Sequence, residues 1–314
     1  IEVYGADVMR LWVSSADYQT DIRLSREIVK QLSDVYRKIR NTFRFLLGNL
    51  DDFNPNTDKV AYENMTEIDK WALLRLEEVK TKVTEAYDNY EFHVMYHAVH
   101  NFCTVDLSSI YLDILKDRMY AEKANDTARK SAQTVMYEVL SSLVRMVSPV
   151  LSFTAEEVWG FMPKEEGAPV SVLLTDWPAV CPEHVNAELG AKWDTLLEIR
   201  SELTKALEQA RRDKTIGHSL DAAVTVYAEG EAYDALKAME ESLEMLLIVS
   251  EVTLVEGKAN APETAVASEE FDMATVVVAS AYEKCERCWI HRDSVGKHEA
   301  HPTLCHRCAS VVAE

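Results

Sequence analysis

The chain has 314 residues, of which 47% are apolar and only nine are glycine. This composition excludes a disordered protein, and the length allows two or more folded domains with sizeable cores. The formal net charge of −20 argues against nonspecific binding to nucleic acid or to membrane surfaces, and the lack of any run of about 18 apolar residues excludes a transmembrane helix.

The chain begins with IEVYGADVMRLWVSS, which has no cationic leader before an apolar run, so we expect no signal peptide. It does not begin with Met, and we expect it to be a piece of a longer protein. Residues 26–48 are the first predicted helix, because apolar residues recur there every three or four positions, and Ser25 and Gly48 suit its two ends. Six basic and two acidic residues give this helix a net charge of +4, which indicates a local site for a polyanion.

Four more helical patterns follow, at 66–90, 92–120, 127–147 and 154–162. The first of them begins with Thr66 and Asp69 at the spacing of a capping box. Long helices joined by short loops are typical of an antiparallel helix bundle. Two clusters of polar residues in this region are expected to be structural. The first, His93, His97 and His100, is not expected to bind a metal, and the second, Asp113, Lys116, Asp117 and Arg118, is not expected to be catalytic.

The pattern changes after the proline-rich segment 163–182. Residues 186–213 predict another long helix, 222–228 a strand, 231–247 a helix and 251–256 a second strand, which together indicate a small α/β unit. Residues 257–270 are typical of a linker, and 273–281 predict a third strand. Twelve acidic residues and two lysines give residues 227–272 a net charge of −10.

Four of the six cysteines lie near the C-terminal end, as Cys285-x2-Cys288 and Cys305-x2-Cys308. This spacing is typical of a structural zinc site with four thiolate ligands, which leaves no coordination position open for catalysis. Metal binding also supplies the folding energy that a segment of about 30 residues lacks. The alternatives are reduced or disulfide-bonded thiols, a redox CxxC pair, or a replacement ligand from His291, His298, His301 and His306.

The other two cysteines, Cys103 and Cys181, are expected to be reduced structural thiols, a usage that fits a reducing cytoplasm. The chain contains no GxGxxG or GxxxxGK[ST] sequence, and no arrangement of Ser, His and Asp or of paired carboxylates indicates an active site. The residues alone therefore predict a mainly α protein, in which a helix bundle is followed by a small α/β unit and a four-cysteine zinc knuckle.

Basic and aromatic residues surround the first cysteine pair. Arg287, Trp289 and Arg292 lie there, and an aromatic ring beside guanidinium groups can stack on an unpaired base and contact phosphate. The alternative is that Trp289 packs inward on the strand 273–281. A second basic group lies at the end of the helix 186–213, where it either favours the helix dipole or contacts phosphate: Arg211, Arg212 and Lys214.

Several stretches resemble the bacterial isoleucyl-tRNA synthetases, and the resemblance covers essentially the whole chain. YGADVMRLWVSSADYQTDIRLS resembles the segment that follows the KMSKS loop of the catalytic domain in that family. SDVYRKIRNTFRFLLGNL, DLSSIYLDILKDRMY and SPVLSFTAEEVW resemble its anticodon-binding helical domain, and RRDKTIGHSLDAAVTV resembles the junction that follows. KCERCW and LCHRC resemble its C-terminal zinc module, which is similar to the zinc finger of formamidopyrimidine-type DNA glycosylases.

This resemblance implies the C-terminal part of a class I aminoacyl-tRNA synthetase, the isoleucine–tRNA ligase. It implies four regions: 1–25 as a remnant that follows the catalytic domain, 26–185 as the anticodon-binding helix bundle, 186–265 as a junction helix with the small α/β unit, and 266–314 as the zinc-binding module. The HIGH and KMSKS signatures are absent, so the catalytic and editing domains, and with them ATP and Mg²⁺, are expected before residue 1, and the chain alone is expected to be inactive.

The resemblance also implies partners and sites. One structural Zn²⁺ is expected on Cys285, Cys288, Cys305 and Cys308. The anticodon stem-loop of tRNA(Ile) is expected to contact three basic groups, which are Arg287 with Trp289; Arg211, Arg212 and Lys214; and Arg37, Lys38, Arg40 and Arg44. We further expect a monomeric cytoplasmic protein that contacts its own catalytic domain and no membrane. The alternatives are a zinc-finger nucleic-acid-binding module of another protein and the equivalent part of a valyl or leucyl relative.

Overall fold

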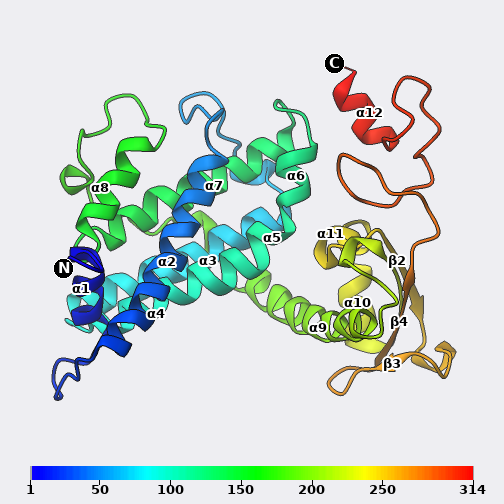
Figure 1. The fold of residues 1–314 in the computed structure, drawn as a ribbon, viewed down its shortest axis with the longest axis horizontal. Helices are drawn as coiled ribbons and strands as arrows, with labels where there is room; N and C mark the ends of the chain where they lie inside the picture. Colours follow the sequence, from blue (N-terminus) through cyan, green and yellow to red (C-terminus); the bar gives the residue numbers. More distant parts are fainter. Residues whose placement is uncertain (1, 314) are drawn as a thin grey trace. The chain divides into compact units, whose positions relative to one another are not determined.

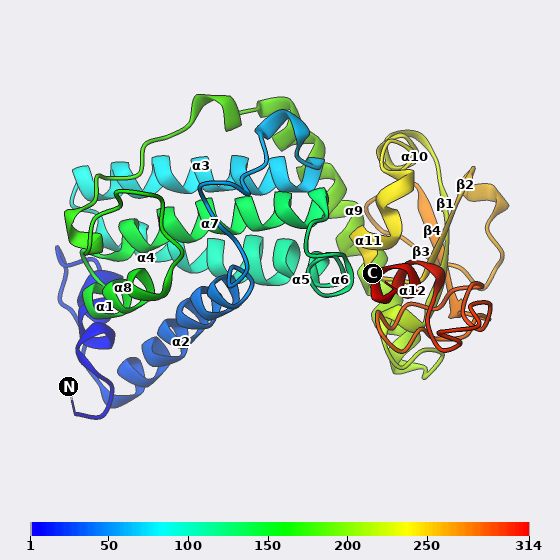
Figure 2. The ribbon, with the colours of Figure 1, turned by 90° about the horizontal axis from the view of Figure 1, so that it is seen from above.

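The computed structural model describes residues 2–313, which form two compact units (Figure 1, Figure 2). The helical unit holds the residues up to Asp113 and Ala124–Asn186, and the mixed unit holds Ile114–Lys123 and the residues from Ala187 onward. The division into four regions given above stays a prediction. Among the described residues, no helix has both the length and the hydropathy needed to cross a lipid bilayer.

The long helices of the helical unit begin and end close to where their apolar periodicity predicts. They are α2 (Arg26–Gly48), α3 (Glu67–Asp88) and α7 (Thr127–Val147). Ser25 caps α2 as predicted, since its hydroxyl accepts a hydrogen bond from the Ile28 amide at 3.2 Å. The Asp126 carboxylate caps α7 in the same way. The shorter elements are α1 (Ala6–Ser15), α4 (Phe92–Asn101), α8 (Ser152–Phe161) and the 3-10 turns η1 (Tyr62–Asn64), η3 (Val172–Leu174) and η4 (Pro182–His184).

These helices form the predicted antiparallel bundle. Helix α3 packs against both α4 and α7, and α2 and α8 also contact α7 (Figure 2). Large apolar side chains fill the space between them, including the fully buried Trp71, Phe43 and Phe102. Burial of this apolar surface is the main force that holds the helices together.

The capping box predicted at the start of α3 is wrong. The Thr66 side chain accepts no capping hydrogen bond at the start of α3, and its hydroxyl donates to Asp69 Oδ2 at 2.7 Å. Asp69 is fully buried and also accepts hydrogen bonds from the hydroxyls of Tyr111 at 2.8 Å and Ser131 at 2.6 Å. Because a buried carboxylate needs such donors, Asp69 serves as a polar link between these hydroxyl groups inside the bundle.

The predicted helix 92–120 is not continuous. After α4 the chain forms a π-helical stretch, η2 (Phe102–Tyr111), and then α5 (Leu112–Ile114) and α6 (Lys116–Ala121). Ser108 and Ser109 each donate a hydroxyl to a carbonyl five residues back, at 2.7 and 2.8 Å. This spacing matches the wider turn of a π-helix, which the apolar periodicity alone does not reveal.

The mixed unit is built on a four-stranded sheet with the order β2-β1-β4-β3. Strands β1 (Ala222–Ala228) and β2 (Glu251–Glu256) are parallel, and the segment that joins them contains α10 (Gly230–Lys237), η6 (Glu240–Ser242) and α11 (Leu243–Leu247). The prediction of one continuous helix at 231–247 is therefore wrong. The predicted strand at 273–281 is β4 (Met273–Ala279), which is antiparallel to β1.

Helix α9 (Ala187–Arg212) packs against β4, α10 and α11, as its predicted apolar stripe requires. The expected linker 257–270 is partly structured, since it contains η7 (Lys258–Asn260) and the short strand β3 (Val266–Ala267), which pairs with β4. The remaining elements are η5 (Ser219–Asp221) and the C-terminal helix α12 (His306–Val312). Between β4 and α12 the chain is mainly irregular and carries the cysteines.

Candidate metal centre and its surroundings

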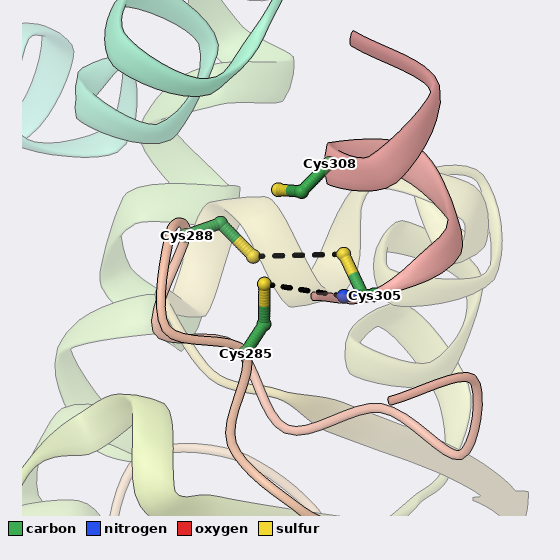
Figure 3. Close-up of side chains that lie close together, drawn as sticks. All are labelled: Cys285, Cys288, Cys305 and Cys308. Atoms are coloured by element: carbon green, nitrogen blue, oxygen red, sulfur yellow. Dashed lines mark hydrogen bonds between the residues drawn. The ribbon is translucent and has the colours of Figure 1, made fainter. Parts of the chain in front are cut away.

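The four C-terminal cysteines point toward one another (Figure 3), and their sulfurs all lie within 4.8 Å of each other. Cys288 Sγ and Cys305 Sγ are 3.9 Å apart. A tetrahedral zinc site with metal–sulfur distances of about 2.3 Å has edges of about 3.8 Å, so this donor set fits such an ion. Among residues 2–313 no other group of three or more His, Cys, Asp or Glu side chains meets in this way, so none of the candidate histidines joins a cluster.

Two backbone features bring the thiols together. The first pair lies in a tight turn in which the Trp289 amide donates to the Cys285 carbonyl at 2.8 Å, and Trp289 itself has a φ of 67°. This left-handed conformation is rare for a bulky residue and marks local strain. The second pair lies at the start of α12, with Cys305 as the N-cap residue. The Cys305 amide donates to Cys285 Sγ at 3.3 Å, which joins the two turns.

The thiols differ in their tendency to ionise. Burial raises the pKa of Cys285, but the backbone amides of Cys288, Cys305 and Arg287 donate to its sulfur and bring the pKa down to about 7. Burial raises the pKa of Cys288 and of Cys308. Since neighbouring thiolates repel one another, a divalent cation stabilises the fully deprotonated cluster.

Arg287 is turned into the protein. Its Nη1 donates to the Ala121 carbonyl at 2.5 Å and to Cys308 Sγ at 3.6 Å, and its Nη2 lies 3.5 Å from the Tyr120 carbonyl. The guanidinium group thus joins the cysteine cluster to the end of α6. No local sequence pattern indicates this contact, because the two partners are 166 residues apart.

Arg307 makes a second link to the same segment. Its two terminal nitrogens each donate to one oxygen of Asp117 at 2.6 Å, and Nη1 also donates to Glu122 at 3.0 Å. Burial lowers the pKa of Arg307, but the hydrogen bonds and charges of the two carboxylates outweigh burial and raise it. This contact agrees with the expectation that the charged cluster around Asp117 is structural.

Trp289 is exposed, with 59% of its surface accessible, so the alternative in which it packs inward on the strand 273–281 is wrong. The ammonium group of Lys284 lies 5.7 Å from the centre of its ring. An exposed indole beside a cation has the chemistry of a surface that stacks on a base and contacts phosphate.

The basic group at the end of α9 is also exposed. Arg211 pairs with Glu208 at 2.5 Å, and Arg212 donates to Gln209 at 2.8 Å. Lys214 lies in the turn that ends the helix, where its backbone has a φ of 61°. Both arginines thus have partners on their own helix, one turn back. This arrangement agrees with the helix-dipole interpretation and leaves phosphate contact as a proposal.

Asp221 fixes the turn that follows this group. Its Oδ2 accepts the amides of Gly217 at 3.2 Å and His218 at 2.7 Å, while Oδ1 lies 3.5 Å from His291 Nε2. One carboxylate therefore contacts both the turn after α9 and the segment that carries the first cysteine pair. Asp221 is not among the predicted site residues, since a single acidic residue before a strand carries no distinctive pattern.

The basic residues of α2 belong to the helical unit. Arg37 is exposed and pairs with Asp34 at 3.0 Å. Lys38 and Arg44 are exposed and Arg40 is half-buried, and none of these three makes an ion pair or a side-chain hydrogen bond with residues 2–313. In a protein of net charge −20, such a group of cations without partners on one helix fits a bound polyanion.

Comparisons with known proteins agree with this arrangement. Residues 69–226 match the family model described as the anticodon-binding domain of tRNA ligase, and residues 283–311 match the model described as a zinc finger found in FPG and IleRS. The second match contains all four cysteines of the cluster.

The chain is similar along its whole length to proteins named isoleucine–tRNA ligase. It is 51% identical to that of Caldanaerobacter subterraneus subsp. tengcongensis, over all of this chain and 34% of that protein. It is 51% identical to that of Desulforamulus reducens and 49% identical to that of Moorella thermoacetica, in each case over 99% of this chain and 33% of the relative. The chain thus spans about a third of the length of the relatives it matches.

Among solved structures, the chain is similar to one in a ternary complex of LeuRS, tRNA and LeuAMS from Agrobacterium radiobacter K84. The sequence identity is 15%, the TM-score is 0.43, and the similarity covers 72% of this chain and 22% of that chain, which is too weak to carry an argument. The family assignment depends instead on the model that matches half of the chain. This chain belongs to the family of anticodon-binding domains of tRNA ligases, and its relatives are isoleucine–tRNA ligases.

Proposed function

We propose that this chain is the tRNA-binding part of an isoleucine–tRNA ligase and that it binds the anticodon stem-loop of tRNA(Ile). The observation that carries the proposal is that one chain contains an anticodon-binding domain together with a zinc finger whose four sulfurs lie within 4.8 Å of one another. The parent enzyme attaches isoleucine to tRNA with ATP and Mg²⁺ in a separate catalytic domain. We place the protein in the cytoplasm and expect it to act as a monomer in contact with that domain.

One structural zinc ion is proposed on Cys285, Cys288, Cys305 and Cys308. The ion supplies charge compensation for the thiolates and holds the two turns in place. The chain's own residues support the site, since the amide of Cys305 and the guanidinium group of Arg287 donate to two of the sulfurs. Such donors orient thiolate ligands and stabilise their negative charge.

RNA recognition is proposed to combine stacking with phosphate contacts. Trp289 offers the exposed ring, and unpaired anticodon bases have faces on which such a ring can stack. The cations proposed to contact phosphates are Arg37, Lys38, Arg40 and Arg44 on α2, and Arg211, Arg212 and Lys214 at the end of α9. For Arg287 the proposed role changes from direct RNA contact to positioning, because its guanidinium group is already bonded within the protein.

The proposed contribution to catalysis is orientation. If the stem-loop is held in a fixed position, the distant acceptor end reaches the catalytic domain in a productive geometry, and the rate of aminoacylation depends on that geometry. Formation of the isoleucyl-adenylate uses ATP and the amino acid alone, so it does not depend on the anticodon contacts.

The substitution Trp289→Ala in the ligase that carries this chain tests the proposal. Stacking of a base on an aromatic ring is worth about 1–3 kcal/mol, so tRNA affinity and aminoacylation are expected to fall by about 5- to 150-fold. ATP–pyrophosphate exchange, which reports adenylate formation, is expected to stay unchanged. The matched control is Phe161→Ala, which removes an aromatic side chain that is 76% exposed on α8.

Zinc content is measured in the same variants. Unchanged tRNA affinity in a Trp289→Ala protein that retains its zinc contradicts the proposed contact, and equal loss of both activities indicates misfolding.

Competition with duplex DNA separates this function from that of a DNA-binding zinc finger. Unlabelled tRNA(Ile) is expected to displace the labelled stem-loop, whereas duplex DNA at the same concentration is not.

A further inference from the structure

We infer that Arg287 and Arg307 are positioning residues that couple metal binding at the four-cysteine cluster to the packing of Ile114–Lys123 against the cysteine-bearing segment. The inference rests on the zinc site of the proposed function and does not depend on RNA binding. Its physical basis is that one guanidinium group contacts both a metal-binding sulfur and the backbone of α6.

Arg287 provides the direct connection. Its Nη1 donates to Cys308 Sγ at 3.6 Å and to the Ala121 carbonyl at 2.5 Å. Ala121 is the last residue of α6, so its carbonyl has no partner further along the helix and is free to accept from a side chain. Packing of α6 therefore fixes the guanidinium group in the position from which it donates to the sulfur.

Arg307 strengthens the same packing from the second cysteine pair. It lies between Cys305 and Cys308 in sequence, and it binds Asp117 with two parallel hydrogen bonds of 2.6 Å. A bidentate arginine–carboxylate pair restricts both partners more strongly than a single ion pair. A rigid Asp117–Arg307 pair thus holds the first turn of α12 against α6, at the point where Cys308 enters the cluster.

The consequence is a thermodynamic linkage. A cluster of four thiolates with one Zn²⁺ has a net charge of about −2, and an N–H donor to a sulfur stabilises that charge. If α6 holds the donor in place, packing of α6 raises metal affinity. By reciprocity, metal binding stabilises the packing of α6 by the same factor.

The substitution Asp117→Asn tests the linkage without changing any residue that touches a cysteine. Binding of Co²⁺ is followed by its thiolate absorption, and the affinity for Zn²⁺ is then obtained by competition. Loss of an outer-shell partner typically lowers metal affinity by 10–100-fold. We expect a loss of metal affinity in this range for Arg287→Met and a loss of up to about 10-fold for Asp117→Asn. Arg287→Lys is expected to give an intermediate loss, because it keeps the positive charge but not the two terminal nitrogens of the guanidinium group.

Lys297→Met is the matched control. It removes an exposed cation of the same segment whose partner, Asp293, is also exposed, and metal affinity is expected to stay unchanged. If Arg287 acts only locally on the sulfur, Arg287→Met weakens metal binding and Asp117→Asn does not. That outcome contradicts the linkage.

Hydrogen exchange of the unmodified chain supplies the reciprocal measurement. Addition of Zn²⁺ is expected to slow exchange of the amides in 116–122, and this effect is expected to shrink in Arg287→Met. If Zn²⁺ binds with no change in these amides, the linkage is wrong while the metal site stands. If no metal binds, the proposed zinc site itself is wrong. Because the effect of Zn²⁺ on exchange is measured in the unmodified chain, it decides the question even where Asp117→Asn does not fold.

Discussion

Glu77 illustrates at the residue scale how a buried charge can hold an irregular segment. It lies on α3 with 1% of its surface exposed, and its carboxylate is 3.1 Å from His184 Nδ1, 3.0 Å from Lys80 Nζ and 2.9 Å from the Cys181 amide. Two of these partners belong to the segment 177–184, which has no regular structure before η4. The carboxylate thus anchors this segment on the bundle.

The pKa of Glu77 predicts when this anchor fails. Burial raises the pKa, but the hydrogen bonds from His184, the Cys181 amide and Lys80 outweigh it and leave the pKa below the usual value of 4.5. Because the folded protein holds the proton less tightly than the unfolded chain, the contribution is complete above about pH 4.5. It is lost as the pH falls through the lower pKa of the folded state.

Glu77→Gln is therefore expected to lower the free energy of unfolding by about 1–3 kcal/mol at pH 7. The difference between the variant and the unmodified protein is expected to shrink at successive pH values below 4.5, where the carboxylate becomes protonated. Urea unfolding across this range measures both effects, and Glu63→Gln, at an exposed position, is the control. A difference that stays constant with pH contradicts the role of the charge.

Helix α2 supplies the prediction at the element scale. Phosphate contacts contribute to affinity without regard to sequence, and each contact adds about one unit to the slope of log affinity against log salt. Lys38→Gln, Arg40→Gln and Arg44→Gln are each expected to weaken binding of the anticodon stem-loop. Each is expected to reduce this slope by about 1 and to act equally on stem-loops with other anticodons.

The control for α2 is Lys237→Gln, which removes a cation on α10 that is paired with Glu240 within the acidic part of the chain. Titrations of labelled stem-loop at several salt concentrations give the slopes. If a variant loses affinity for the stem-loop of one anticodon and not for the others, the replaced residue contacts a base rather than a phosphate. If all three α2 variants keep the salt slope of the unmodified protein, α2 does not contact RNA.

The elements also show how far periodicity predicts structure. The apolar patterns of α2, α7, α9, β1 and β2 predicted their positions closely, because apolar residues recur in each element at the period of its own secondary structure. The π-helical stretch was not predicted, since the apolar pattern does not show whether hydrogen bonds span four or five residues. Strand β3 has only two residues and depends on pairing with β4, so its own sequence contains no alternation to detect.

At the scale of the whole molecule, the sequence predicted which residues form the candidate metal centre but not what surrounds it. The two CxxC pairs indicate four ligands because their spacing is local. The contacts of Arg287 with Ala121 and of Arg307 with Asp117 join positions 166 and 190 residues apart, and no local pattern marks them. The basic composition around the first cysteine pair therefore suggested RNA contact for Arg287, whereas packing uses its guanidinium group within the protein.

The division into two compact units leads to a prediction about metal removal. Bound metal stabilises only the folded state of the part that binds it, by about 3–4 kcal/mol when the free metal concentration is 100 to 1,000 times the dissociation constant. The cysteines and Ile114–Lys123 belong to the mixed unit. A chelator is therefore expected to lower the unfolding transition of this unit by about 10 °C and to leave that of the helical unit unchanged.

Scanning calorimetry with and without chelator measures the two transitions, and hydrogen exchange assigns each to its unit. The amides of α6 are expected to follow the mixed unit, although residues on both sides of Ile114–Lys123 in sequence belong to the helical unit. Cys308→Ser is the control, because a chain that has lost a ligand is expected to respond little to the chelator. Equal shifts of both transitions contradict the prediction, since they mean that the two units unfold as one cooperative structure that the metal stabilises throughout.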